Sequence, residues 1–234
     1  MGEFATLNLS ASVGDHPSAV AENWARVQRA FPEVQLWLRM RQVHGTAVRV
    51  VDHVPSGEPP ECDGLVTNMH GAAVCVLTAD CVPILLASSD GALVAAVHAG
   101  WRGTAGRVAA EAVRAMVENF DVPATQLWAA LGPSIGACCY EVGDEVAALV
   151  AAAGLGKALI RGRRGRCHLN LRLANRVTLH EAGVPPEQIF DVGGCTACST
   201  QMFFSHRGQK GRAGRQLSFI VCARNPLQLH AVNG

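Results

Sequence analysis

Short apolar runs recur along the chain and predict a fold rich in β-strands. Each run is bounded by glycine, proline or polar residues that favour turns, and Asp90-Gly91 predicts a tight turn between two of them. The predicted strands are residues 34–40, 48–51, 65–67, 72–77, 82–87, 92–97, 127–131, 189–192 and 217–222.

Four other segments carry apolar side chains at helical spacing and predict amphipathic helices, over residues 20–31, 104–120, 142–153 and 171–182. Thr104 is suited to be an N-cap. The predicted strands outnumber the helices, and several neighbouring strands are joined by short turns. We therefore expect an α+β fold, a layered α/β arrangement with mixed sheets. No repeat or linker divides the chain, so residues 1–234 are expected to form one domain.

The composition of the chain argues against several classes of function. The 234 residues are 49% hydrophobic and 17% charged, which is enough to bury a sizeable core. The net charge of +1 gives no reason to expect nucleic acid as a partner. No apolar stretch approaches the ~20 residues of a membrane span. No signal peptide is visible, so we expect a cytoplasmic protein whose nine cysteines stay reduced.

The segment around His98 is the most informative part of the chain. An apolar strand ends at His98, a glycine-bracketed turn follows with Trp101 and Arg102, and the helical pattern begins at Thr104. This order predicts an imidazole that serves as metal ligand or general base, next to a cation at a helix N-terminus, where anions bind well. Arg102 is therefore a candidate phosphate ligand, with Arg41 as a second candidate.

His44, Cys81 and His98 each end an apolar run or follow a predicted strand. Side chains at strand ends commonly converge on one rim of a sheet. Two imidazoles and one thiolate suit Zn²⁺, and three protein ligands leave the fourth position open, as in catalytic zinc sites. Copper binds such a set as well. The alternatives are a buried, unreactive Cys81 and a loop histidine at position 44.

Two other cysteine motifs have no assigned role. Cys195-Thr196-Ala197-Cys198 can bind metal or carry redox chemistry, but no second motif of this kind and no histidine at ligand spacing accompanies it. A structural or incidental role is favoured. Cys138 and Cys139 would point in opposite directions if their segment were extended. Residues 203–207 and 214–216 form either a surface loop or a loop that offers aromatic and cationic groups to a ligand.

These motifs together resemble the YfiH-like, or laccase-domain, family, whose members are described as polyphenol oxidases and as purine nucleoside phosphorylases with adenosine deaminase activity. The matching stretches include Arg41-Gln42-Val43-His44-Gly45, Asp63-Gly64-Leu65-Val66-Thr67, Thr78-Ala79-Asp80-Cys81-Val82-Pro83, His98-Ala99-Gly100-Trp101-Arg102-Gly103, Gly132-Pro133-Ser134-Ile135-Gly136 and Cys139-Tyr140-Glu141-Val142-Gly143. They lie between about residue 6 and residue 220, so the resemblance covers almost the whole chain.

The resemblance implies a zinc site at His44, Cys81 and His98 and a fold similar to that of cysteine-hydrolase toxins. It also implies purine nucleosides and phosphate as small-molecule partners. Arg41, Gln42 and Arg102 are then the expected substrate or phosphate ligands, and Asp80 is a candidate proton carrier beside catalytic Cys81 and His98. We expect a monomer or a small homo-oligomer.

The chain departs from the family pattern in two places. It lacks the usual segment before the Leu7-Asn8-Leu9 stretch, so we expect a truncated N-terminal strand. It also has Asn170 where relatives tend to have aspartate, and loss of that carboxylate could change substrate contacts.

Three functions follow as hypotheses. The first is a zinc-dependent purine nucleoside phosphorylase with adenosine deaminase activity, although the usual zinc-deaminase signature is missing. The second is a copper-dependent polyphenol oxidase; against it, none of the nine histidines forms a His-x-His pair. The third is a metal-free hydrolase that edits peptidoglycan precursors, with Cys81 as nucleophile and His98 as its base.

Overall fold

Three mixed or antiparallel sheets and five α-helices make up the protein in a computed structural model that describes residues 4–162 and 165–223. The helices are α1 (Pro17–Ala30), α2 (Trp101–Ala105), α3 (Val108–Phe120), α4 (Asp144–Val150) and α5 (Leu171–Glu181). The strands are β1 (Leu36–Leu38), β2 (Val48–Val50), β3 (Gly64–Thr67), β4 (Ala72–Thr78), β5 (Val82–Ser88), β6 (Val94–Ala99), β7 (Leu127–Leu131), β8 (Glu141–Val142), β9 (Leu159–Arg161), β10 (Cys167–Leu169), β11 (Ile189–Asp191) and β12 (Gln216–Val221).

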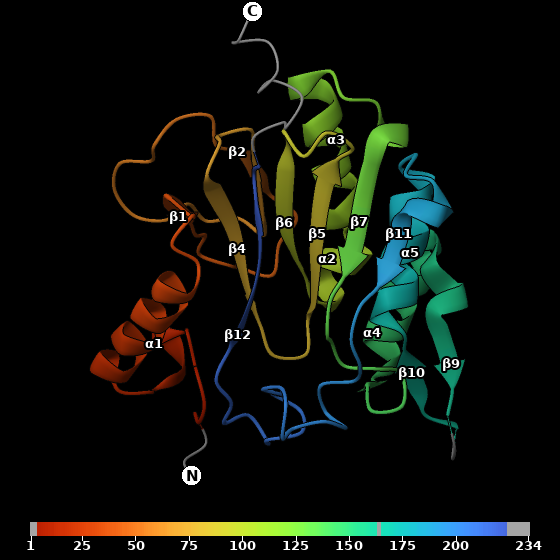
Figure 1. Cartoon of the computed structure of the whole chain (residues 1–234). Helices are drawn as coiled ribbons and strands as arrows, with labels where there is room; N and C mark the ends of the chain where they lie inside the picture. The colour runs from red at the N-terminus through yellow and green to blue at the C-terminus, as the bar shows by residue number, and fades with distance from the viewer. Residues whose placement is uncertain (1–3, 163–164, 224–234) are drawn as a thin grey trace, which may run out of the picture.

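The largest sheet has the order β11-β7-β5-β6-β3-β2. Its central strands β7, β5, β6 and β3 pair antiparallel, whereas β11 and β2 are added in parallel at the two edges. A second sheet has the order β1-β4-β12, and a third, with the order β8-β10-β9, lies beside α4 and α5 (Figure 1). The mixed-sheet α+β fold expected from the sequence is confirmed.

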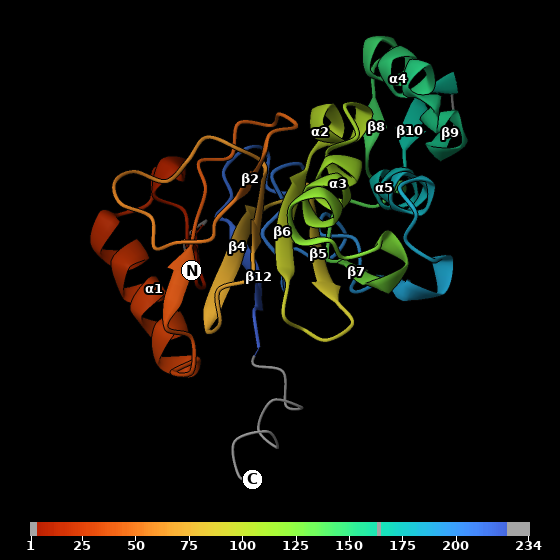
Figure 2. The same ribbon diagram turned by 90° about the horizontal axis from the view of Figure 1, so that it is seen from above.

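The layered arrangement of sheets and helices reflects which faces of the strands carry apolar side chains. Along β6, Val97 and Ala99 pack into the core beneath α3, whereas Val94 and Ala96 face the β1-β4-β12 sheet. Because both faces of β6 are covered, the strand is apolar at every position except His98. Helices α2 and α3 cover one face of the large sheet, and α1 covers the far side of the small sheet (Figures 1 and 2).

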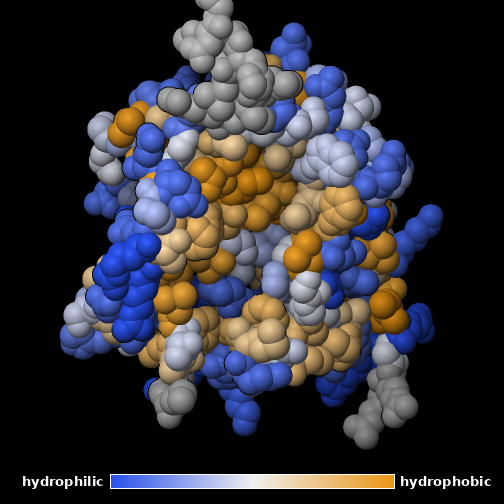
Figure 3. Space-filling view, viewed as in Figure 1, coloured by the Kyte–Doolittle hydropathy of each residue, from blue (hydrophilic) through white to orange (hydrophobic). Residues whose placement is uncertain are grey.

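The small sheet leaves part of the large sheet uncovered. Leu85 and Ala87 of β5 and Ile220 of β12 are only partly buried. Figure 3 shows apolar residues gathered in the middle of the face on which β12, β5 and β7 lie. None of the helices among the described residues is long and apolar enough to cross a membrane.

The sequence prediction of a single helix over residues 104–120 is wrong. The segment forms α2 and α3, with a break at Arg107, which has a left-handed backbone (φ 63°). Thr104 is not an N-cap, because α2 already starts at Trp101 and buries Thr104 inside it. The break lets Thr104 Oγ1 accept a hydrogen bond from Asn175 of α5 at 2.9 Å.

Candidate active site

His44, Cys81 and His98 meet at one end of the large sheet. His44 lies in the loop after β1, Cys81 in the turn before β5, and His98 near the end of β6. Their ligand atoms all lie within 4.8 Å of one another. The two imidazoles are edge to face, with ring centroids 4.7 Å apart. The structure therefore brings together the three residues that the sequence singled out, two from the neighbouring strands β5 and β6 and one from the loop after β1.

Asp63 holds this group in place. Its buried carboxylate accepts hydrogen bonds from the backbone N–H groups of His44 (3.0 Å) and Gly45 (2.6 Å). It also contacts His98 Nδ1 at 2.8 Å. An ionised carboxylate can only accept, so Nδ1 carries a proton. Nε2 of His98 is then the nitrogen that would bind a metal ion, after loss of the proton that it shares with Cys81. The same carboxylate thus fixes the left-handed His44 backbone (φ 59°) and the tautomer of His98.

Electrostatics favour an ionised Cys81. Burial by itself would raise the pKa of the thiol, but hydrogen bonds from His44 and His98 outweigh it and lower the pKa to about 6. Burial likewise would lower the pKa of His98, yet its hydrogen bonds to Asp63 and Cys81 raise that pKa to about 9. The group therefore favours a thiolate, which is the form of cysteine that binds metals and attacks electrophiles.

Gly100 sets the spacing of the group. A Cβ atom at this position would lie 3.1 Å from Cys81 Sγ and 3.1 Å from His44 Cδ2. A side chain here would push against two of the three candidate ligands. The glycine that follows β6 is therefore a packing requirement of the site.

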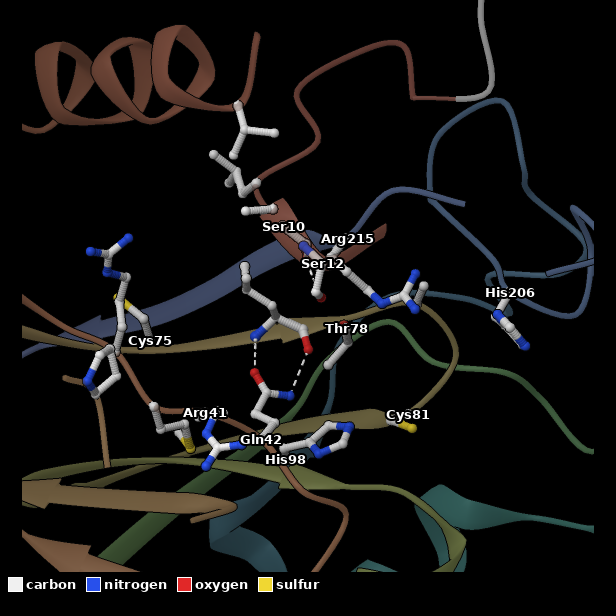
Figure 4. A pocket seen from close by; sticks show the side chains of 18 of the residues that line it. Ser10, Ser12, Arg41, Gln42, Cys75, Thr78, Cys81, His98, His206 and Arg215 are labelled. Carbon is white, nitrogen blue, oxygen red and sulfur yellow. Dashed lines mark hydrogen bonds between the residues drawn. The ribbon is translucent and has the colours of Figure 1, made fainter. Parts of the chain in front are cut away.

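A cleft of about 1400 Å³ opens beside the three residues. His44, Asp80, Cys81 and His98 form part of its wall. Figure 4 shows His98 and Cys81 on one side of the cleft, with Arg215 and His206 farther along it. The remaining lining residues include Ser10, Ser12, Trp24, Arg39, Arg41, Gln42, Thr78, Tyr140 and Arg207.

The segment between β11 and β12, residues 192–215, is here named the late loop. It contributes His206, Arg207 and Arg215 to the wall of the cleft, and α1 with the segment before it forms a further part. Asp80 ties this loop to the metal-ligand side. Its carboxylate accepts hydrogen bonds from Thr196 Oγ1, Ser205 Oγ and the backbone N–H of Arg207, each at 2.6 Å. Figure 1 shows the late loop passing beside the connection from β4 to β5, which carries Asp80.

The predicted substrate ligands have unequal positions. Gln42 lines the cleft, but its amide is bound to the backbone of Leu77, accepting at 2.9 Å and donating at 2.8 Å (Figure 4). Arg41 also lines the cleft and is paired with Glu61. Arg102 stacks on Trp101 with its guanidinium carbon 4.4 Å from the ring centroid, and it is not among the residues that line the cleft.

The sequence analysis assigned no role to Asp63 and Tyr140, and it left Arg207 and Arg215 open between a surface loop and a ligand-binding loop. Arg215 is half-buried, and burial lowers its pKa although the charges of Cys81 and Asp80 oppose that effect. Asp63 could have been found as an acidic residue at the start of a buried strand. The cationic residues of the late loop were noted, but their position depends on contacts that only the folded chain makes.

Asn170 has a local role. Its side chain accepts a hydrogen bond from the backbone N–H of Leu173 at 3.1 Å and so forms the N-cap of α5. Aspartate and asparagine serve as N-caps about equally well. Asn170 is not among the described residues that line the cleft.

Known proteins resemble the chain over nearly its full length. Residues 1–223 match the family described as multi-copper polyphenol oxidoreductase laccase. The chain belongs to this laccase family. A protein of Deinococcus radiodurans named purine nucleoside phosphorylase is 41% identical over 225 residues, which are 95% of this chain and 85% of the relative. Members of the laccase family thus carry names of different activities.

A further relative and a solved structure are also similar to the chain. A protein named adenosine deaminase RL5, from an unknown prokaryotic organism, is 36% identical over 93% of this chain and 87% of its own length. The crystal structure of YlmD from Geobacillus stearothermophilus superposes with a TM-score of 0.86 at 33% identity, covering 96% of this chain and 87% of that chain. The family resemblance and the mixed-sheet fold expected from the sequence are both confirmed, and the relatives are named as enzymes.

Proposed function

We propose that this protein is a zinc-dependent purine nucleoside phosphorylase that also deaminates adenosine. The observation that carries the proposal is the placement of His44, Cys81 and His98, with ligand atoms within 4.8 Å, in the wall of a large cleft. Two imidazoles and a thiolate fit Zn²⁺, and they accept copper as well. A bound zinc ion would supply Lewis acidity to a substrate in the cleft.

The chain supplies cations for phosphate on the late-loop side. In phosphorolysis an oxygen of phosphate forms a bond to C1′ of the nucleoside, while the bond from C1′ to the base breaks. The bonding electrons leave with the base, which takes up a proton, and the sugar 1-phosphate remains. Arg215 and Arg207 line the cleft, and neither is paired with a carboxylate within residues 4–162 and 165–223. Each guanidinium group is held by backbone carbonyls, Arg215 by those of Ala213 and Gly214 and Arg207 by that of Glu141. Their remaining N–H groups would bind phosphate oxygens, as arginine commonly does.

Other residues would bind and orient the nucleoside. The buried hydroxyl of Thr78 lines the cleft and has no hydrogen-bond partner in the described structure, so a polar group of the substrate would satisfy it. Asp63 keeps His98 in one orientation. The cleft of about 1400 Å³ exceeds the ~300–1,000 Å³ of common small-molecule sites, which leaves room for nucleoside and phosphate together.

Deamination is the second activity, favoured by the relative named adenosine deaminase. Water adds at C6 of adenosine and ammonia leaves, which gives inosine and requires a proton transfer to the leaving amine. We keep Asp80 as the candidate proton carrier. Its three hydrogen bonds to the late loop add a positioning role to that assignment.

The test is incubation of metal-characterised protein with adenosine, with and without phosphate. Adenine and ribose 1-phosphate that appear only with phosphate support phosphorolysis, whereas inosine in either condition supports deamination. Absence of all these products from protein with a full complement of zinc contradicts the proposal. The matched control is Cys167→Ala, which changes a cysteine of β10 that does not line the cleft.

The same metal-characterised protein distinguishes the proposed zinc enzyme from two alternatives. A metal-free thiol enzyme with Cys81 as nucleophile would keep its activity after chelation and form a covalent adduct at Cys81. A copper enzyme would oxidise phenols and need copper. Activity that is lost on chelation and restored by Zn²⁺ excludes both.

A further inference from the structure

Four cysteines gather at the protein surface away from the proposed active site. Cys138 and Cys139 lie in the turn between β7 and β8, and Cys195 and Cys198 lie in the late loop. Their sulfur atoms all lie within 4.8 Å of one another. The expectation that Cys138 and Cys139 point apart assumed an extended segment, but residues 137–139 form a turn, which directs both thiols to the same side.

The sulfur spacing fits a metal ion better than a disulfide. Cys198 Sγ lies 3.7 Å from Cys138 Sγ and 3.3 Å from Cys139 Sγ. Disulfide sulfurs are about 2.05 Å apart. Zinc bound tetrahedrally by four thiolates at about 2.3 Å holds them roughly 3.8 Å apart. The two distances from Cys198 are therefore close to those around a zinc ion, and the remaining sulfur pairs lie within 4.8 Å.

The surrounding backbone is built to bring the two turns together. The backbone N–H of Gly136 donates a hydrogen bond to Cys195 Sγ at 3.2 Å. A Cβ atom on Gly136 would lie 3.1 Å from Cys138 Sγ, so the close approach requires glycine. Ser134 accepts a hydrogen bond from the N–H of Thr196 at 3.1 Å, which pairs the two segments independently of the thiols.

We propose that Cys138, Cys139, Cys195 and Cys198 bind a structural Zn²⁺ ion that is separate from the ion proposed at His44, Cys81 and His98. On binding, the four thiols release their protons to water, and no electron is transferred. The charge of the ion offsets the repulsion among four adjacent thiolates. Cys138 and Cys198 are exposed, so the ion can enter from solvent.

The site would stabilise the cleft. Tyr140 follows Cys139 and lines the cleft, and Thr196 follows Cys195 and donates to Asp80. A metal ion here would join the segment before β8 to the late loop at the point where both approach Asp80. It would act on the shape of the cleft and take no part in the chemistry.

The test measures the zinc content of reduced protein in which the proposed site at His44, Cys81 and His98 has been disrupted. Cys81→Ser is the background variant, because it removes a ligand of the proposed active-site ion. We expect this variant and its control, Cys81→Ser with Cys167→Ser, to retain about one zinc per chain, as a tetrathiolate site holds. Adding Cys195→Ser and Cys198→Ser should remove it. Equal zinc content in the control and the cluster variant would overturn the proposal.

A second measurement needs no change in the cluster and so does not depend on the folding of a variant. Cobalt replaces zinc in the Cys81→Ser protein, and we expect strong thiolate-to-cobalt charge-transfer absorption with the visible bands of tetrahedral Co²⁺. Absence of these bands would contradict the proposal. So would an intact mass that shows a disulfide between Cys139 and Cys198 in protein purified under reducing conditions.

Discussion

The two sides of the cleft are built in different ways. The strand-end wall, defined here as His44, Asp63, Cys81 and His98, lies in the loop after β1 and at the ends of β3, β5 and β6, where β6 pairs with both β3 and β5 in the centre of the large sheet. The late loop, another part of the cleft wall, has no helix or strand and is tied to the turn before β5 by the carboxylate of Asp80. Groups that hold a metal ion need a rigid support, whereas substrate recognition is commonly left to loops. The comparison predicts that substitutions on the two sides will have different consequences.

The largest effect is expected from Cys81→Ala on the strand-end wall. This change removes the only thiolate of the proposed ligand group, so nucleoside cleavage should fall by roughly 1,000-fold or more and zinc at this site should be lost. Product analysis and elemental analysis measure the two effects. Cleavage by Cys81→Ala at the wild-type rate would remove the strand-end wall from the chemistry.

Asp63→Asn should weaken the same wall through its support. The amide can no longer accept from His98 and from the three backbone N–H groups of residues 43–45 together, so zinc affinity or activity should drop about 10- to 100-fold. Asp121→Asn, at the exposed end of α3, is the matched control. An Asp63→Asn protein with unchanged zinc affinity would show that the wall needs no orienting carboxylate.

The contribution of Asp63 to the stability of the fold should depend on pH. Burial tends to raise the pKa of Asp63, but the hydrogen bonds from His98, Gly45 and His44 outweigh it and hold the pKa below its usual value. The stabilisation is present above the ordinary carboxyl pKa of about 4 and is lost as the pH falls through the lowered value. Urea unfolding should therefore show a higher free energy of unfolding for wild type than for Asp63→Asn near neutral pH, and this difference should shrink below about pH 4. A difference in the free energy of unfolding that does not change with pH would contradict a stabilising role for the ionised Asp63 carboxylate.

On the loop side, Arg215→Met should act on phosphate binding. Loss of a charge-assisted hydrogen bond costs about 1.5–3 kcal/mol, so the KM for phosphate should rise roughly 10- to 100-fold while zinc content stays constant. Arg102→Met is the paired variant, because Arg102 is exposed and stacked on Trp101 outside the cleft. A larger effect from Arg102→Met than from Arg215→Met would restore the prediction made from the sequence.

The smallest effect is expected from Ser205→Ala. It removes one of the three hydrogen bonds to Asp80 and leaves those from Thr196 and Arg207. We expect a loss of about 1 kcal/mol in the free energy of unfolding and a modest rise in the KM for nucleoside. Denaturant titration and steady-state kinetics measure both. If kcat fell instead at constant KM, Asp80 would be acting in proton transfer more than in holding the loop.

The sequence predicted three of the four residues of the strand-end wall because those three mark strand ends. His44, Cys81 and His98 interrupt or follow apolar runs, and the mixed sheet brings those ends together. Asp63 was given no role because its position at the start of a buried strand indicates a buried carboxylate but not the four hydrogen-bond donors that converge on it. Such convergence depends on the loop after β1 reaching the start of β3.

The late loop could not be placed from its residues. Arg207 and Arg215 stand in a segment without periodicity, and only the contacts of Asp80 and the start of β12 direct them to the cleft. The four-cysteine cluster was missed for a related reason. Two turns distant in sequence meet there, and the local conformation of residues 137–139 decides where the thiols point.

The span of the Asp80 contacts has a consequence for the order of folding. The proposed ligands all lie between residues 44 and 98, within or next to elements that are close in sequence. Asp80 instead reaches Thr196, Ser205 and Arg207 across 116, 125 and 127 residues. Contacts that close long loops form late, because their entropic cost comes before their reward. A growing chain can therefore bring the proposed metal ligands together before the late loop, with its proposed phosphate ligands, has been made.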